Sequence, residues 1–310
     1  MDLSLFLIII LLSTLFNVFS QNYLLKNNFI DKINARSSHN VLATRSGGLS
    51  IFSILFLSSV FFYLKGQDVY DFSILVPLSI LFIIGLYDDL FKVDFKLKFI
   101  FQIIAAKILI DYGFVIDNFH GIMGINELDR MFAQVFTIFI IVAIINSINF
   151  IDGIDGLAIS VVSIFIILYE YFSINEAEFQ TLSIIILASF IPLIYFNFRS
   201  KKKVFLGDSG SIFLGGLVSV YVLNILSNDY IIKKEFDLNK IIFIISILSY
   251  PIIDLIRVFF IRILKGRSPF IADRNHLHHI LLDKFKSHIL TSLFILFMSI
   301  LFTIFVQLLF

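Results

Sequence analysis

Apolar stretches long enough to cross a lipid bilayer recur along the whole of this chain. A helix needs about 20 residues to cross a hydrocarbon core of about 30 Å. Seven stretches approach this length without a charged side chain, and three more are interrupted by charge; the ten cover residues 3–20, 49–64, 72–87, 99–114, 131–151, 156–173, 179–198, 209–228, 241–256 and 287–310. Because lipid offers the backbone no hydrogen-bond partners, each span must satisfy its own polar groups, as helices do. We therefore expect an all-α integral membrane protein with about ten transmembrane helices.

The composition agrees with this expectation and excludes several other classes of protein. Hydrophobic residues make up 59% and charged residues 15%, with a mean hydropathy of +0.97, whereas soluble domains average roughly 45–50% and about 25%. A net charge of +1 argues against a nucleic-acid partner, which usually requires a strongly basic face. The absence of cysteine excludes disulfides, thiolate metal ligands and a cysteine nucleophile.

Lysine and arginine are distributed unevenly between the loops, which predicts the orientation of the helices. Cytoplasmic loops carry the excess of positive charge. Most of the basic residues fall in one alternate set of loops, at residues 21–48, 88–98, 149–157, 197–208 and 257–286. We expect this set on the cytoplasmic side and both termini outside. No basic segment precedes the first apolar stretch, so it is expected to be a retained helix of one polytopic domain, 1–310.

Two adjacent carboxylates, Asp88 and Asp89, follow the third apolar stretch on the predicted cytoplasmic side. Such a pair at a membrane edge can be no more than two solvated charges at a helix end. It can also bind a hard cation or act as a general base. The two residues alone leave both interpretations open.

Asparagine, aspartate and glycine are concentrated at residues 146–156, where an apolar run is interrupted. The glycines predict a bend between two helices. No basic residue lies near these amides and carboxylates in the sequence, and polar groups at such depth are costly and usually functional.

A second polar segment, residues 207–211, begins the eighth apolar stretch with the sequence Gly-Asp-Ser-Gly-Ser. Asp208 or Ser209 could serve only as the N-cap of that helix. A helix N-terminus with glycines beside it also suits a phosphate group.

Three of the six histidines lie within residues 276–279, shortly after Arg274. Without cysteine, a zinc site there would need other ligands, and a contact with nucleotide or phosphate is the favoured interpretation. A further basic segment, residues 36–48, contains His39 and Arg45 and ends in two glycines.

Together these segments indicate one site at the membrane surface, with carboxylates and amides for Mg²⁺ and basic residues for a phosphorylated ligand. Mg²⁺ usually takes one or two protein ligands and leaves the rest to substrate phosphates and water. Phosphoryl transfer needs little beyond positioning and charge neutralisation. A transporter is the main alternative, but transporter sites lie near the bilayer midplane and often between repeats. Here the acidic motifs lie at helix ends on one side, which favours an enzyme.

Four motifs in this order resemble those of the polyprenyl-phosphate N-acetylhexosamine-1-phosphate transferases (glycosyltransferase family 4). They are Asp-Asp at 88–89, Asn-x-x-Asn-x-x-Asp-Gly-x-Asp-Gly-Leu at 146–157, Gly-Asp-x-Gly-Ser at 207–211 and His-x-His-His at 276–279. The resemblance implies a Mg²⁺-dependent enzyme of the bacterial inner (cytoplasmic) membrane. Such an enzyme transfers a sugar 1-phosphate from a UDP-N-acetylhexosamine to undecaprenyl phosphate at the cytoplasmic face and releases UMP.

The resemblance also implies roles for individual residues. The expected catalytic carboxylates are Asp88, Asp89, Asp152 and Asp155. The first two would serve the acceptor phosphate or the metal, with Asp88 as base or nucleophile, and the other two would line the nucleotide pocket. The expected Mg²⁺ ligands are Asn149 and Asp208. The expected substrate-binding residues are His39, Arg45, Lys92, Asn146, Gly207, Arg274, His276, His278 and His279.

The spacing of the histidines is similar to one branch of this family. The phospho-MurNAc-pentapeptide translocases have three consecutive histidines, whereas the pattern here, with Pro-Phe-x-x-Asp-Arg before it, is similar to enzymes that start O-antigen, enterobacterial common antigen or teichoic acid chains. GlcNAc is the default sugar for that branch. The basic loop at 44–48 departs from the family form Thr-Pro-Arg-Gly-Gly because it lacks the proline. Membrane lipid is a further expected partner, and a homodimer stays open.

Overall fold

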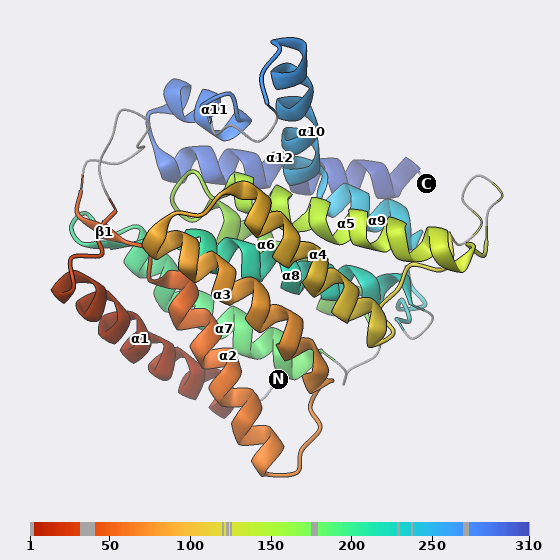
Figure 1. The fold of residues 1–310 in the computed structure, drawn as a ribbon. Helices are drawn as coiled ribbons and strands as arrows, with labels where there is room; N and C mark the ends of the chain where they lie inside the picture. Colours follow the sequence, from red (N-terminus) through yellow and green to blue (C-terminus); the bar gives the residue numbers. More distant parts are fainter. Residues whose placement is uncertain are drawn as a thin grey trace.

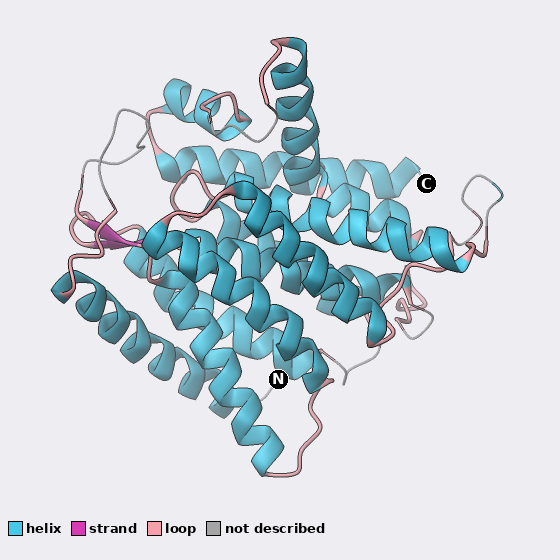
Figure 2. Cartoon of the chain, viewed as in Figure 1, coloured by secondary structure: helices cyan, strands magenta, loops and turns pink. Residues whose placement is uncertain are grey.

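The computed structural model describes residues 3–31, 41–119, 121, 124, 126–174, 179–227, 230–236, 238–268 and 273–309. These residues form a bundle of helices (Figure 1) with one short pair of strands (Figure 2). The helices are α1 (Leu3–Lys26), α2 (Gly47–Leu64), the 3-10 helix η1 (Phe72–Ile74), α3 (Leu75–Phe91), α4 (Phe95–Asp111), α5 (Arg130–Ile151), α6 (Leu157–Phe172), α7 (Gln180–Asn197), α8 (Gly207–Leu226), α9 (Lys240–Ile247), α10 (Ser249–Leu264), α11 (Leu277–Phe285) and α12 (His288–Leu309).

The all-helical class is confirmed, and the number of spans is smaller than predicted. Each of the ten apolar stretches is helical. By length and hydropathy, seven helices of the described chain could cross a membrane, or eight if α9 and α10 form one span. The stretch 241–256 is not one straight helix, because α9 and α10 meet at a bend of 68°. The charged helix α4 and the 16-residue helix α6 fall short of the same test.

Helix α8 occupies the centre of the bundle, where α2, α3 and α5 pack against it. Every residue of α8 except Asp208 and Leu226 is buried. Small residues allow this close packing: a Cβ on Gly48 of α2 would lie 2.2 Å from the backbone nitrogen of Gly210 in α8. Small residues at helix contacts are typical of membrane bundles, where backbone approach and van der Waals packing replace the hydrophobic effect.

The two strands bring the beginnings of α2 and α8 together. β1 (Ala43–Thr44) pairs in parallel with β2 (Lys203–Val204), and the backbone N–H groups of Gly47 and Gly48 continue the contact to the carbonyls of Phe205 and Leu206, both at 2.9 Å. In Figure 1 the strand pair and the start of α12 lie at one end of the bundle, with both chain termini toward the other. The same end holds the polar residues of the predicted site.

Helix α10 projects out of the bundle (Figure 1). Its buried residues include Asp254, Val258 and Arg262, spaced four apart and therefore on one face. After α10, the chain returns to the bundle through α11, which lies beside the start of α12. We call α10, α11 and residues 273–276 the arm.

Candidate active site

A polar cavity of about 380 Å³ opens at this end of the bundle, between the arm and the helices α3, α4, α5 and α8. Its lining combines carboxylates, amides, cations and rings from segments far apart in the sequence. The lining residues are Asp88, Phe95, Lys98, Phe99, Gln102, Asn146, Asn149, Phe150, Asp152, Gly153, Asp208, Arg262, Asp273, His276 and His279. Seven of the predicted site residues are therefore brought together.

The acidic side of the cavity converges on a single lysine. The Nζ atom of Lys98 lies 2.8 Å from Oδ2 of Asp208 and 3.2 Å from Oδ2 of Asp88. Asp88 is held at the end of α3 because its Oδ1 accepts a hydrogen bond from the backbone N–H of Val93 at 2.6 Å. Two carboxylates that share one ammonium group form a place where positive charge is strongly favoured.

Asp89 has a different task from its neighbour Asp88. Its two carboxylate oxygens accept hydrogen bonds from the backbone N–H groups of Asp208 and Ser209, both at 2.9 Å. Asp89 thus caps the N-terminus of α8 from another helix, where the dipole also favours a negative charge. Gly207 makes room for this cap: its φ is +74°, and a Cβ there would lie 2.6 Å from Oδ2 of Asp89. The capping role considered for Asp208 belongs to Asp89.

The predicted metal ligands Asn149 and Asp208 lie on neighbouring walls of the cavity. Oδ1 of Asn149 accepts a hydrogen bond at 2.9 Å from Ser211, which is one helical turn beyond Asp208. Above it on α5, Nδ2 of Asn146 donates to Oε1 of Gln102 at 2.7 Å. Carboxylate and amide oxygens that line one cavity fit the ligand preference of Mg²⁺.

The two aspartates that follow α5 have different surroundings. Asp152 faces the cavity, and burial together with the carboxylates of Asp208 and Asp89 raises the pKa of its carboxyl well above the usual range. Asp155 lies outside the cavity lining: its carboxylate is paired with the Lys203 ammonium group, and its backbone N–H donates to Nδ1 of His288 at 3.1 Å. Of these two residues, only Asp152 is placed to accept a proton or to bind a cation at the site.

A cationic wall faces the carboxylates. Arg262 is 3% exposed at its side chain and donates to both oxygens of Asp273, each at 3.1 Å. Its guanidinium also lies 5.9 Å from the centre of the Phe150 ring. Although partial burial works against it, hydrogen bonds from Arg262 and Asn275 hold the pKa of the Asp273 carboxyl well below its usual range. The pair is therefore fully charged at neutral pH.

The histidines at 278 and 279 are neutral side chains. Burial and the neighbouring histidines lower the pKa of His278 well below its usual value, and burial, Arg274 and His276 lower the pKa of His279 to about 4. Nε2 of His278 and Nδ1 of His279 have no hydrogen-bond partner among the described residues. At neutral pH these two rings can contribute hydrogen bonds, and the positive charge comes from Arg262 and Lys98.

A second groove, of about 360 Å³, is apolar. It runs between α5, α8, α9 and α10, with side chains such as Phe136, Ile140, Ile144 and Leu255 along its walls. The helices α5 and α10 also contribute to the lining of the polar cavity. A polar cavity and an apolar groove on the same two helices suit a ligand with a charged head and a long hydrocarbon chain.

Comparison with known proteins gives the family. The sequence profile of glycosyl transferase family 4 matches residues 71–226. The chain belongs to this family. An undecaprenyl-phosphate alpha-N-acetylglucosaminyl 1-phosphate transferase of Pasteurella multocida is 35% identical over 274 residues, covering 83% of this chain and 72% of that protein. A protein of the same name from Haemophilus influenzae is 33% identical over 271 residues, covering 81% of this chain and 71% of its own length.

Several residues expected to bind substrate in this family member lie away from the cavity lining. Arg45 pairs with Asp31 at 2.8 Å and lies 3.5 Å from Asp89, so it supports the cap of α8. Lys92 is exposed at the end of α3, and Arg274 pairs with Asp283 at 3.0 Å. Gly207 makes room for the cap of α8 instead of lining the cavity. His278 is buried outside the cavity lining, and His39 lies outside the described residues.

Sequence reasoning missed the cations of the site in this family member. Lys98 lies on α4, ten residues after Asp88. The sequence-based prediction named Lys92, in the same basic segment, as the substrate-binding lysine. Arg262 was treated as part of a long basic loop. The one available signal was Asp254, a carboxylate that interrupts an apolar stretch eight residues before Arg262, which is a spacing of about two helical turns.

Proposed function

We propose that this chain transfers N-acetylglucosamine 1-phosphate from UDP-GlcNAc to undecaprenyl phosphate and releases UMP, the first step of a cell-surface polysaccharide. The observation that carries the proposal is that α5 and α10 line two hollows of different character. The polar cavity supplies opposed carboxylates and cations, and the groove is apolar. The names of the relatives support GlcNAc as the sugar and undecaprenyl phosphate as the acceptor.

In the proposed reaction, an oxygen of the acceptor phosphate attacks the β-phosphorus of UDP-GlcNAc. A new P–O bond forms there, and the bridging oxygen leaves with UMP. Arg262 and Lys98 are placed to offset the charge of the diphosphate. Asp88 would take the proton from the acceptor phosphate, or attack UDP-GlcNAc first to form a phosphosugar intermediate. Asp152, whose pKa is raised, is a second proton acceptor within the same cavity.

A divalent ion fits the acidic wall. We assign Asn149 and Asp208 to Mg²⁺, with Asp88 beside them, because the carboxylates of Asp88 and Asp208 already converge on one ammonium group. When bound, Mg²⁺ would supply charge neutralisation to the diphosphate, as it does in other phosphoryl transfers. Without it, two carboxylates would repel the acceptor phosphate.

The apolar groove is the proposed seat of the polyprenyl chain. Its walls are almost wholly hydrocarbon, and two of the helices that form them, α5 and α10, also line the cavity. An acceptor lying there would present its phosphate to Asp88 and Lys98. The rest of its chain would remain among the lipids.

The direct assay uses purified protein in detergent with undecaprenyl phosphate, Mg²⁺ and a panel of UDP-sugars, and measures released UMP. UDP-GlcNAc should give the highest kcat/KM, and UMP release should require the polyprenyl phosphate. Rapid release with another UDP-N-acetylhexosamine, and slow release with UDP-GlcNAc, would reassign the sugar while leaving the reaction class in place.

The site is proposed to face the cytoplasm, where UDP-sugars are found. Single-cysteine variants test this cleanly because the chain contains no cysteine. Ser268→Cys, on the exposed turn after α10, should react with an impermeant thiol reagent only after spheroplasts are opened. Gln67→Cys, exposed between α2 and η1, should react in intact spheroplasts. The opposite pattern would invert the topology.

A further inference from the structure

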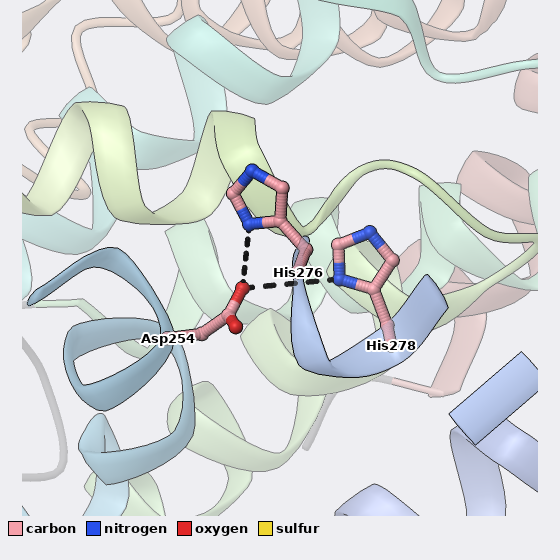
Figure 3. A group of neighbouring side chains, drawn as sticks. All are labelled: Asp254, His276 and His278. Carbon is pink, nitrogen blue, oxygen red and sulfur yellow. Dashed lines mark hydrogen bonds and ion pairs between the residues drawn. The ribbon is translucent and has the colours of Figure 1, made fainter. Parts of the chain in front are cut away.

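A cluster of three buried side chains lies next to the cationic wall, and one of its members, Asp254, has been given no role so far. The cluster consists of Asp254 on α10, His276 just before α11, and His278 in the first turn of α11 (Figure 3). Oδ2 of Asp254 lies 2.7 Å from Nδ1 of His276 and 4.0 Å from Nδ1 of His278. The side chain of Asp254 is 0% exposed.

The surroundings of the cluster favour a hydrogen-bonded pair over a metal centre. The other oxygen of Asp254, Oδ1, accepts a hydrogen bond from the backbone N–H of Leu277 at 2.8 Å and lies 3.7 Å from the guanidinium of Arg257. A second guanidinium, that of Arg262, lies 3.3 Å from Nε2 of His276. Two neighbouring positive charges oppose a divalent ion, and 2.7 Å is the length of a charge-assisted hydrogen bond.

The partners of His276 determine where its proton lies. A buried, ionised carboxylate can only accept a hydrogen bond, so Nδ1 of His276 must donate to Asp254. A guanidinium can only donate, so Nε2 must accept from Arg262. The neutral ring with its proton on Nδ1 is the form that satisfies both partners.

We propose that Asp254 is a positioning residue that holds His276 in the Nδ1–H tautomer and thereby fixes Nε2 against Arg262 at the cavity wall. The inference rests on the proposed function, since it is that reaction which needs Arg262 aimed at a diphosphate. The hydrogen bond from Leu277 gives the same carboxylate a second effect. It ties the first residue of α11 to α10, and so joins the two helices of the arm next to the cavity wall.

Asp254→Asn tests this assignment with almost no change in volume. An amide has one acceptor oxygen; if that oxygen serves Leu277, the amide NH₂ faces Nδ1 of His276 and drives the proton to Nε2, where it meets a donor of Arg262. In histidine-labelled protein, the nitrogen-15 signals of the His276 ring, assigned by their loss in His276→Gln, should change from the Nδ1–H to the Nε2–H pattern. UMP release should fall about 10- to 100-fold, as for other carboxylates that orient a functional histidine, with the KM for UDP-GlcNAc raised and the KM for undecaprenyl phosphate unchanged.

Glu170→Gln is the matched control. Glu170 is a partly buried carboxylate on α6 that accepts a hydrogen bond from Ser183. Its replacement should leave the His276 signals and both KM values unchanged, even if it lowers stability by as much as Asp254→Asn does.

The wild-type spectrum keeps the proposal falsifiable if Asp254→Asn does not fold. A His276 ring that is protonated on Nε2, or on both nitrogens, at neutral pH would overturn it. So would a stoichiometric zinc ion in the purified protein that is lost in His278→Gln. Wild-type protein that releases no UMP from any UDP-sugar would refute the proposed function, whereas the nitrogen-15 pattern would still decide the role of Asp254.

Discussion

The two halves of the cavity are built in different ways. The acidic half comes from the ends of α3, α5 and α8. Of these, α8 is the deeply buried central helix, and α3 and α5 pack against it. The cationic half comes largely from the arm, which projects from the bundle at a 68° bend and returns through α11. The profile of the family covers residues 71–226 and therefore the first half only. The difference indicates that the charge of the proposed metal site is fixed by the core, whereas the cations proposed to face the substrate depend on how the arm is held.

The largest effect is expected in the acidic half, at Asp88. Asp88→Asn keeps the shape of the side chain and the acceptor for Val93 but removes the base or nucleophile. UMP release should fall by about 10²- to 10⁴-fold, the usual contribution of general acid–base catalysis, with binding of UDP-GlcNAc retained. Equilibrium binding and turnover measured on the same preparation separate the two effects.

A matched control for Asp88 is Asp94→Asn. Asp94 is exposed and caps α4 by accepting a hydrogen bond from Lys96 at 3.1 Å, a role that asparagine fills equally well. Equal activity in both variants would mean that Asp88 is only a charge at a helix end. Exchange of labelled UMP into UDP-GlcNAc without acceptor would indicate a covalent intermediate, whereas transfer without such exchange would indicate direct attack, which we expect.

A smaller but still large loss is expected for Asp208→Asn. Asparagine preserves the start of α8, because Asp89 and not Asp208 caps that helix. The substitution removes the charge that would hold Mg²⁺ against the diphosphate, so UMP release should drop at least about 10²-fold, the scale of losing one electrostatic stabiliser. Activity above half of the wild-type value across a Mg²⁺ titration would remove Asp208 from the metal site.

In the cationic half, Arg262→Lys should raise the KM for UDP-GlcNAc about 10-fold. Lysine keeps the charge but cannot bind Asp273 through two nitrogens and reach His276 at once. The matched control is Arg267→Lys on the exposed turn after α10, which should change neither KM. If Arg262→Lys instead raised the KM for undecaprenyl phosphate, the arm would bind the acceptor and not UDP-GlcNAc.

The acidic half was largely predictable from sequence, because its chemistry is concentrated in short motifs. Asn149, Asp152 and Asp208 interrupt apolar runs with polar residues that lipid makes costly, and all three face the cavity. The distinction between Asp88 and Asp89 was not predictable, since it depends on which of two adjacent side chains reaches the N-terminus of another helix.

The cationic half was less predictable because its partners are separated in sequence and its backbone direction changes. The apolar pattern of residues 241–256 predicts one helix, and the only sign of the 68° bend is Pro251, which lies in the first turn of α10. Arg262 and His276 are 14 residues apart and meet only when the arm folds back. The sequence pointed to Arg45, Lys92 and Arg274 as the cations of the site. The position of a basic residue in a loop does not show which carboxylate it pairs with in the fold.

The smallest effect is expected on the stability of the protein at acidic pH, through His279 in the arm. His279 has its pKa lowered to about 4 by burial, by the positive charge of Arg274 and by the neighbouring His276, which together outweigh the carboxylates of Asp283 and Asp254. Its unfolded value is about 6.5, so between pH 6.5 and 4 the unfolded chain binds more protons than the folded one. Stability should therefore be complete above pH 6.5 and decline as the pH falls toward 4. Thermal unfolding in detergent, followed by circular dichroism across this range, should show a shallower decline for His279→Gln, whose side chain does not titrate; an identical decline in both proteins would mean that the titration of His279 is not coupled to folding.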